Sequence, residues 1–253
     1  MTDDTGQKAA AAESFDEHAS AYVESDAHRA GEDLATLADW AGDATRALDV
    51  ATGAGHTGGA VLDRRVPEVV VTDAAPAMIR TAESEFPGVS GAVGDAEALP
   101  FVANAFDAVT CRIAAHHFPD PVAFVREVAR VTEPGGVFAL EDNIAPEDDD
   151  LDAFLHRIER LRDPSHARSH RESEWRRWIT DTGFGIEEAV VIKRTIDYRD
   201  WIAQLDTPTE NRAELEALFA DPPDGAGELY EITHDRDGLA SFANLKLLVR
   251  ARR

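Results

Sequence analysis

The residues best suited to chemistry lie in one stretch, in which a carboxylate is followed closely by two glycines. Asp49 sits in an apolar run, Ala47–Ala51, that predicts a buried strand, and Gly53 and Gly55 follow it directly. Glycine tolerates positive φ angles and lets a ligand approach the backbone. A helix is expected to begin just after the turn, from Gly59, and its N-terminus offers unpaired N–H groups. A carboxylate beside such a turn suits a ligand that carries an amino group, so the stretch predicts a ligand-binding corner.

The same glycines also fit another pattern, because residues 53–58 match G-x-G-x-x-G, the dinucleotide fingerprint. Asp73 ends a second predicted strand, Glu68–Asp73, and lies 20 residues beyond Gly53. This spacing suits a carboxylate that accepts the hydroxyls of a ribose. A structural role for Asp73, as N-cap of a helix expected over Pro76–Glu85, stays open. Spacing alone therefore indicates a nucleoside ligand without choosing between cofactors.

A third run follows the short predicted strand Val89–Val93 and reads Gly-Asp-Ala-Glu-Ala-Leu-Pro-Phe over Gly94–Phe101. With the motif around Asp49, it resembles class I S-adenosylmethionine (SAM) dependent methyltransferases of the ubiquinone/menaquinone (UbiE-like) type. The resemblance implies that Asp95 accepts the adenine amino group and that the backbone N–H of Ala96 meets a ring nitrogen. It implies a cofactor site made of Asp49, Gly53, Gly55, Asp73, Ala74, Asp95, Ala96 and Arg112.

The rest of the first 144 residues continues this pattern. Strands are expected over Ala105–Arg112 and Val137–Asn143, with a helix between them that Asp120 caps and Pro121 begins. Phe-Asp-x-Val and Arg-Val-x-x-Pro-Gly-Gly complete the family's alternation of strands and helices. The expected fold class is α/β, a Rossmann-like class I methyltransferase. Its central sheet would be seven-stranded, mostly parallel, flanked by helices and with a helical insertion after strand five.

We predict one methyltransferase domain over 1–253, because no linker rich in Pro, Gly or Ser divides the chain. Its expected parts are an N-terminal helical cover (1–40), a SAM-binding core (41–144), a helical lid (145–185) and C-terminal strands and helices (186–253).

Phe15 and Tyr22 lie on one face of a helix expected over Ala9–Tyr22. Ordinary packing against the core is one interpretation of this face. The resemblance implies the other, a cover over the cofactor, and makes both side chains candidate substrate contacts.

The expected lid consists of two helices, Leu151–Leu161 and Ser169–Thr182. Ser169 and Glu172 suggest a capping box for the second helix, and the acidic run Glu147–Asp150 is typical of a solvated face. This segment resembles the uncharacterised Bacillus YcgJ-type subgroup of the family. Between the two helices lie three polar residues: Arg162, Asp163 and His166. They suit an anionic or polar substrate group, although an Arg–Asp pair could be structural.

Beyond the lid we expect a strand over Ala189–Ile196 and helices over Tyr198–Leu205 and Thr209–Phe219. A hairpin is predicted between Tyr230–Thr233 and Phe242–Val249. A reversed seventh strand near the C-terminus is what a class I methyltransferase sheet would have.

His116 and His117 follow the fourth predicted strand, at the same edge of the sheet as the candidate cofactor residues. Acid/base work or substrate contact is one interpretation and a structural role is the other. With His166 they are the candidate catalytic residues, and Asp142 and Asn143 at the end of strand five are candidate substrate contacts. No metal site is predicted, because no Cys/His cluster has ligand spacing.

The predicted function is SAM-dependent methyl transfer (EC 2.1.1.-) to a small-molecule acceptor by in-line SN2 displacement. The methylated atom, whether oxygen, nitrogen or carbon, is left open, and so is the need for a general base. An NAD-dependent oxidoreductase is the alternative enzyme. A SAM- or nucleotide-binding module without turnover is the alternative that is not an enzyme.

The composition restricts the partners, because 49 Asp and Glu against 25 Lys and Arg give a formal net charge of −24. Such a field repels nucleic acid and anionic membranes. No run of about 18 apolar residues predicts a membrane span. The acidic N-terminus lacks signal-peptide features, and Cys111 is the single cysteine. We therefore expect a cytoplasmic protein without nucleic-acid or integral membrane association, and the oligomeric state stays open.

The charge also predicts a response to salt. With lysine at only three positions, we interpret the acidity as adaptation to a salt-rich cytoplasm, although an ordinary acidic protein is the alternative. Melting midpoints measured from about 0.1 to 3 M KCl should climb by many degrees as the self-repulsion is screened. A flat or falling curve would exclude the halophilic interpretation.

Overall fold

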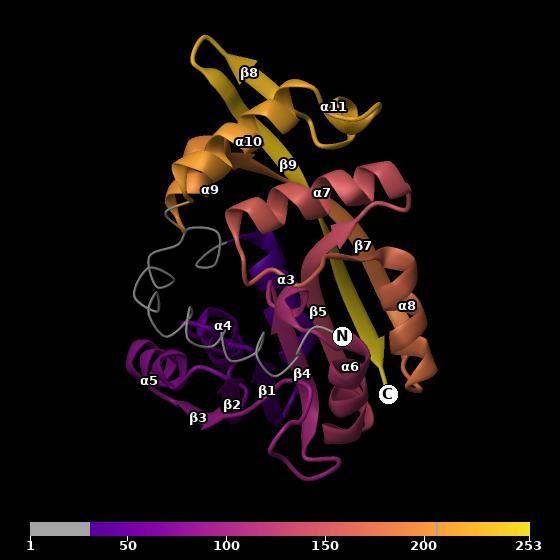
Figure 1. Cartoon of the computed structure of the whole chain (residues 1–253). Coiled ribbons are helices and arrows are strands. Elements are labelled where there is room, and N and C mark those ends of the chain that lie inside the picture. Colours follow the sequence, from indigo (N-terminus) through magenta and orange to yellow (C-terminus); the bar gives the residue numbers. More distant parts are fainter. Residues whose placement is uncertain (1–30, 206) are drawn as a thin grey trace.

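The computed structural model describes residues 31–205 and 207–253, so the expected N-terminal helix with Phe15 and Tyr22 lies outside the described residues. One mixed sheet crosses the molecule in the strand order β3-β2-β1-β4-β5-β9-β7 (Figure 1). Its strands are β1 Arg46–Val50, β2 Glu68–Asp73, β3 Val89–Val93, β4 Phe106–Arg112, β5 Thr132–Ala145, β7 Gly185–Asp197 and β9 Gly238–Arg252.

Strands β1 to β5 pair in parallel, and β9 runs antiparallel to both β5 and β7. The predicted Rossmann-like sheet with one reversed strand near the C-terminus is therefore confirmed. Two short strands lie off the seven-strand path: β6 His170–Arg171 pairs with β5, and β8 Thr233–Asp235 pairs with β9.

The central strands alternate between two apolar cores, because successive side chains of a strand point to opposite faces. Leu48, Val50 and Val109 face one core, and Ala47 and Ala108 face the other. Helices α6 Pro121–Val131 and α8 Glu172–Asp181 cover the first face. Helices α3 Glu32–Ala41, α4 His56–Asp63 and α5 Pro76–Glu85 cover the second. Within the described ranges, no helix is long and apolar enough to cross a membrane.

The order of the strands creates a switch point between β1 and β4. From β1 the chain proceeds outward through β2 and β3, then returns to place β4 on the other side of β1. In open parallel sheets, ligands bind outside the carboxyl ends of the strands at such a point. The fold therefore indicates where the site should lie.

A third core, which we call the cap, lies beyond the carboxyl ends of the strands (Figure 1). It is built by α7 Asp149–Arg162, α9 Tyr198–Ala203, α10 Thr209–Ala220, α11 Ala226–Leu229 and the far part of β9. Phe154 and Ile158 of α7 pack there with Phe219 and Phe242. Helix α8 instead buries Trp175 in the core on the first face of the sheet, with Leu48 and Val109. The segment predicted as one lid thus contributes to two cores, and its movement as a unit stays a prediction.

The second helix of that segment begins later than predicted. Residues 170–171 form β6 and pair in parallel with Ile144 and Ala145 at the end of β5, so this backbone is extended. Helix α8 starts at Glu172, and Glu174 accepts the backbone N–H of Arg171 at 3.0 Å. The capping box on Ser169 was therefore wrong, because pairing with the sheet claims the residues that it needed.

The predicted C-terminal hairpin exists with different strands. Its first strand, β8, starts at Thr233 and pairs with residues 238–241 of β9. Residues 242–249 of β9 pair mainly with β5 and β7. Tyr230 is fully buried in the cap and ends helix α11, where its N–H donates to the Ala226 carbonyl at 2.9 Å, so its backbone does not start a strand.

The turn between β1 and α4 uses two glycines in left-handed conformations. Gly53 has φ +53° and Gly55 has φ +94°. A Cβ added at Gly55 would lie 2.7 Å from the Ala82 Cβ, whereas a Cβ at Gly53 would meet nothing within 4 Å. A substitution at Gly53 would therefore introduce conformational strain alone, whereas one at Gly55 would introduce both strain and a steric clash.

Gly55→Ala should destabilise the chain more than Gly53→Ala. Both carry a left-handed strain of roughly 1–2 kcal/mol, and Gly55→Ala adds overpacking of about 1–3 kcal/mol. Urea unfolding of the two variants and the wild type measures the difference. Equal losses would mean that packing against α5 does not restrict this turn.

Candidate functional site

Asp49 lies at the centre of the glycine motif, and only 2% of the residue is exposed. The hydroxyls of Thr52 (2.6 Å) and Thr110 (2.7 Å) and the N–H of Gly58 (3.1 Å) donate to its carboxylate. Burial raises the pKa of Asp49 to about 6, although these hydrogen bonds favour the ionised form. Asp49 thus ties β1 to the turn, to α4 and to β4. Its contact with a ligand amino group stays a prediction.

Asp73 ends β2 and holds the same turn from the other side. Its Oδ2 accepts the N–H of Gly53 at 2.9 Å, and its Oδ1 accepts the N–H of Ala75 at 2.9 Å. The N-cap of α5 is Ala75, so Asp73 is not the helix cap that the sequence left open. Ala74, which lies between Asp73 and Ala75 in the sequence, is exposed. The ribose role of Asp73 stays a prediction.

Asp95 follows β3, and its carboxylate accepts the N–H of Glu97 at 2.9 Å. The residue before it, Gly94, lies against Pro100, where an added Cβ would come within 2.6 Å of the ring. This packing gives a structural reason for a glycine and a proline six residues apart. Ala96 is buried beside Asp95, and the adenine role of both residues stays a prediction.

Sequence reasoning missed how the Leu-Pro-Phe run is held. Arg130 of α6 donates to the carbonyls of Leu99 (2.9 Å) and Phe101 (2.6 Å), and Glu127 accepts the N–H of Leu99 at 2.7 Å. Arg130 belongs to the Arg-Val-x-x-Pro-Gly-Gly motif. Both motifs are visible in the sequence, but only the fold shows that Arg130 binds the Leu-Pro-Phe run.

Arg112, a predicted cofactor residue, takes part in a buried ion-pair network. Its guanidinium lies 2.7 Å from Asp33 of α3 and 2.7 Å from Glu141 of β5, and Glu141 also pairs with Lys246 at 2.7 Å. Its side chain is 2% exposed. This network connects four elements that are distant in sequence, and a cofactor contact of Arg112 stays a prediction.

The three candidate catalytic histidines come together. His116 and His117 lie in the 3₁₀ helix η1 Ala115–His117, directly after β4. Their ring centroids are 4.2 Å apart, and the ring of His166 stacks on His116 at 5.2 Å. Asp142 of β5 bonds His116 Nδ1 through Oδ1 at 2.6 Å. The predicted edge of the sheet therefore carries a compact group of imidazoles.

The three histidines differ in protonation. Burial alone would lower the pKa of His116, but the charge of Asp142 raises it above the ordinary value. Burial and the neighbouring His116 lower the pKa of His117 to about 4. Burial and the other histidines also lower the pKa of His166 far below its usual range. Around neutral pH, His116 is the member of the group that carries or exchanges a proton.

The segment after α7 is bound directly to these histidines. The backbone N–H groups of Ala167 (2.9 Å) and Arg168 (3.0 Å) both donate to the carbonyl of His116. Ser165 Oγ lies 3.2 Å from His117 Nδ1 and donates to Asp163 at 2.6 Å. Burial opposes the shift, but His117 and these hydrogen bonds hold the pKa of Asp163 below its ordinary value.

Arg162 is separated from the other two polar residues of this break. Its Nε donates to the Trp201 carbonyl at 3.1 Å and its Nη2 donates to Gln204 at 2.8 Å, so the guanidinium faces α9. Asp163 and His166 instead face the histidines. The structure thus brings together only two members of the predicted trio.

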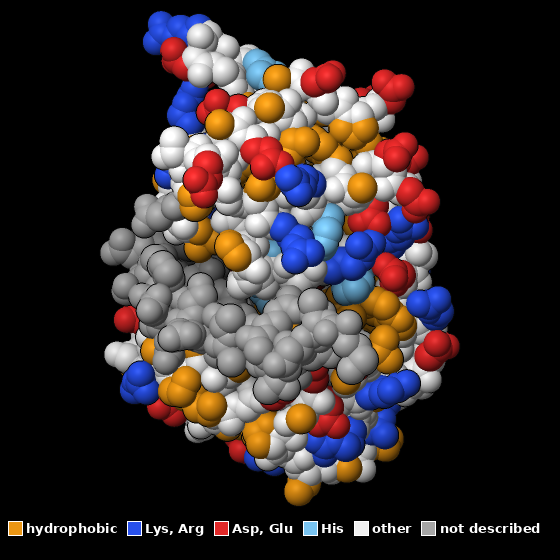
Figure 2. Space-filling model, viewed as in Figure 1, with side chains coloured by type: hydrophobic (Ala, Val, Ile, Leu, Met, Phe, Trp, Pro, Cys, Tyr) orange, Lys and Arg blue, Asp and Glu red, His pale blue; other side chains and the backbone are white. Residues whose placement is uncertain are grey.

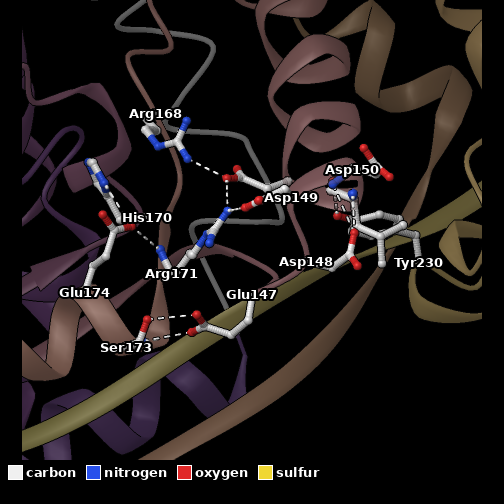
Figure 3. Close-up of polar contacts among 12 residues, drawn as sticks. Glu147, Asp148, Asp149, Asp150, Arg168, His170, Arg171, Ser173, Glu174 and Tyr230 are labelled. Atoms are coloured by element: carbon white, nitrogen blue, oxygen red, sulfur yellow. Dashed lines mark hydrogen bonds and ion pairs between the residues drawn. The ribbon is translucent and has the colours of Figure 1, made fainter.

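The acidic run Glu147–Asp150 is exposed, as predicted, and three of its side chains also hold the neighbouring segments in place (Figure 3). Glu147 accepts from the N–H and hydroxyl of Ser173, and Asp148 caps α7. Arg171 bonds both Asp149 (2.6 Å) and Asp152 (2.8 Å). Figure 2 shows basic and histidine side chains gathered over α7 and the segment after it, with acidic side chains around them.

The remaining predicted residue, Asn143, donates its N–H to Asp142 Oδ1 at 2.9 Å. Its own Oδ1 is buried without a hydrogen-bond partner among the described residues, and the same holds for Asp142 Oδ2 and His166 Nε2. Across the described ranges, no group of three or more His, Cys, Asp or Glu is arranged to hold a metal ion. The site therefore offers hydrogen bonds and a proton acceptor.

Known proteins are similar to this chain in sequence. A family model for the methyltransferase domain matches residues 48–140. The chain is 36% identical over 231 residues to YcgJ of Bacillus subtilis, an uncharacterized methyltransferase, and the match covers 88% of this chain and 91% of YcgJ. A demethylmenaquinone methyltransferase of Renibacterium salmoninarum is 35% identical over 97 residues, covering 38% of this chain and 40% of that protein.

The solved structures agree with the sequence matches. A candidate methyltransferase from Bacillus halodurans, 36% identical, superposes with a TM-score of 0.83 over 88% of this chain and 99% of its own. The resemblance to YcgJ-type proteins is thus confirmed over most of the chain, and the resemblance to UbiE-like proteins over the shorter stretch that matches the demethylmenaquinone methyltransferase. The chain belongs to the methyltransferase family that includes YcgJ and has the Rossmann-like fold of class I methyltransferases.

Proposed function

We propose that this protein transfers a methyl group from SAM to a small-molecule acceptor. One observation carries the proposal: Asp49, Asp73 and Asp95 lie at or just beyond the carboxyl ends of β1, β2 and β3 on one side of the switch point, and His116 and His117 follow β4 on the other. The first side would hold the cofactor and the second the acceptor. The methyl group would then meet the acceptor near the boundary between β1 and β4.

The residues present fit the cofactor. Gly53 has open space where a Cβ would lie, so a ligand could approach the turn there. We assign the adenine to Asp95 and Ala96, the ribose to Asp73, and the amino group to the region of Asp49, Gly53 and Gly55. SAM supplies an activated methyl group, and the chain aligns the acceptor with it, which in well-oriented reactions contributes about 7–11 kcal/mol.

The setting of this reaction follows from the charge. A chain with a net charge of −24 disfavours polyanionic partners, so we infer a small diffusible acceptor in the cytoplasm. The family match supports methyl transfer over the alternative of an NAD-dependent oxidoreductase. A carboxylate at Asp49 also disfavours a pyrophosphate at the turn.

Calorimetry with the purified chain should detect SAM binding and no NAD binding. Asp95→Ala should weaken SAM binding by about 1–3 kcal/mol, because a hydrogen-bonding group of the ligand loses its partner. Asp237→Ala, in the exposed β8–β9 turn, is the matched control and should leave the affinity unchanged. If Asp95→Ala binds SAM like the wild type, the adenine lies elsewhere.

Turnover separates an enzyme from a binding module. A small-molecule extract added with SAM should release S-adenosylhomocysteine in the presence of the chain and not in its absence. Binding of SAM without any release would favour the sensor interpretation.

The segment 163–171 should protect the acceptor side, since it lies over His116 and is held there by the Ala167 and Arg168 N–H groups. His166→Ala should leave SAM affinity nearly intact and lower turnover. Hydrogen exchange over residues 163–171 should slow when the active extract fraction is added with S-adenosylhomocysteine. If exchange is unchanged by the acceptor and His166→Ala keeps full activity, the segment does not form part of the acceptor site.

A further inference from the structure

Asp142 and His116 form a pair with fixed geometry. Asp142 Oδ1 lies 2.6 Å from His116 Nδ1 and also accepts the Asn143 N–H at 2.9 Å. Both residues are buried, with 1% of Asp142 and 7% of His116 exposed. A carboxylate only accepts hydrogen bonds, so the imidazole donates its Nδ1 proton. The orientation and tautomer of His116 are thereby set.

This tautomer leaves the other ring nitrogen as a proton acceptor. In the neutral ring, Nε2 carries the lone pair when Nδ1 carries the proton. None of the described residues makes a hydrogen bond to His116 Nε2. Neighbouring rings hold the imidazole in place, with His117 at 4.2 Å and His166 stacked at 5.2 Å between centroids. A carboxylate that orients a histidine in this way is the arrangement of a general base.

The charges around His116 indicate what it would act on. Carboxylates face it from three directions: Asp142 from β5, Glu159 from α7 and Asp163 from the segment after α7. Arg162, whose charge acts on the neighbouring His166, has its guanidinium bound to α9. His117 and His166, whose pKa values are lowered, are neutral around pH 7. Carboxylates thus dominate, and an anionic acceptor is disfavoured.

We propose that His116, oriented by Asp142, is the general base of the reaction and that the acceptor is an uncharged molecule with a hydroxyl or amine N–H. The proposal rests on the function proposed above. The acceptor's proton passes to His116 Nε2 while its oxygen or nitrogen forms a bond to the methyl carbon. The carbon–sulfur bond breaks, its electron pair stays on sulfur, and S-adenosylhomocysteine leaves. His116 then returns the proton to solvent, so charge and atoms balance.

The proposal defines a pH dependence. His116 accepts a proton only when neutral, and Asp142 raises its pKa above 6.5. Turnover should therefore rise with pH through that raised pKa and level off above it. Besides Asp142, the groups that face His116 and shape this profile are His117 from η1, Glu159 from α7, and Asp163 and His166 from the segment after it.

The first test measures the pair without any acceptor. Histidine resonances of the whole chain are followed by NMR against pH, and His116→Gln identifies the resonance of His116. In Asp142→Asn the pKa of His116 should fall by about 1–3 units, since an opposite charge is removed. His234→Gln, in the exposed strand β8, should leave the His116 titration unchanged. An unchanged titration in Asp142→Asn would overturn the pairing, and far-UV dichroism confirms that each variant is folded.

The second test follows turnover with a small-molecule extract as the probe. His116→Gln and Asp142→Asn should lower S-adenosylhomocysteine release by roughly 10²–10⁴-fold and keep wild-type SAM affinity. His234→Gln should retain the wild-type rate. Wild-type rates in both dyad variants would overturn the proposal. If the wild type itself releases no product, the proposed function fails, and the NMR result still decides whether the pair exists.

The class of acceptor is tested with the same extract. Passage over an anion exchanger at neutral pH divides it into a bound anionic fraction and an unbound neutral or cationic fraction. The activity should remain in the unbound fraction. Activity found only in the anionic fraction would overturn the assignment of an uncharged acceptor.

Discussion

The buried carboxylate of Asp49 is the constraint on which the site depends. It accepts hydrogen bonds from Thr52, Gly58 and Thr110, and so joins the central strand to the turn, the following helix and the neighbouring strand. An isolated carboxylate at this depth would be strongly destabilising, and three donors offset that cost. The arrangement works only because the turn brings the Thr52 hydroxyl and the Gly58 N–H to one point. The left-handed Gly53 and Gly55 make that turn possible.

Two further sets of polar contacts hold the site in place, one within the sheet and one between the sheet edge and the cap. Arg112 ties α3 to β5 through Asp33 and Glu141. Arg168 and Arg171 tie the segment after α7 to Asp152. The pairs of Arg168 and Arg171 with Asp152 hold the segment that carries His166, and its backbone N–H groups bind the His116 carbonyl. The electrostatics that restrict the partners thus also build the acceptor side.

Local motifs made much of this predictable. The order of strands and helices up to residue 145, the cap formed by Asp120 and Pro121, and the grouping of the histidines follow from periodicity and from parallel strands ending at one edge. The function of Asp49 within the turn did not follow, because the fold brings Thr110, 61 residues away, to its carboxylate. Arg162 and Asp163 are adjacent in sequence, yet the end of α7 sends them to different sides.

The misplaced start of α8 and the unforeseen contacts of the acidic run have the same origin. Ser169 and Glu172 have the spacing of a capping box, but β6 pairs with the end of β5 and delays the helix. Glu147 to Asp150 are exposed as expected, but their partners Ser173 and Arg171 lie more than 20 residues away, so no local pattern could predict those contacts. Pairing between strands that are distant in sequence overrides local helix preference where a segment passes the carboxyl edge of the sheet. The candidate site lies at that edge.

The central claim is that the cofactor occupies the ends of β1 to β3 with its sulfur toward the histidines. A crystal structure of the chain with S-adenosylhomocysteine tests it most directly. We predict the adenine at Asp95 and Ala96, the ribose hydroxyls on Asp73, and the sulfur near the switch point between β1 and β4, on the side of His116. The ligand bound at another edge of the sheet, or with its sulfur away from His116, would contradict the account.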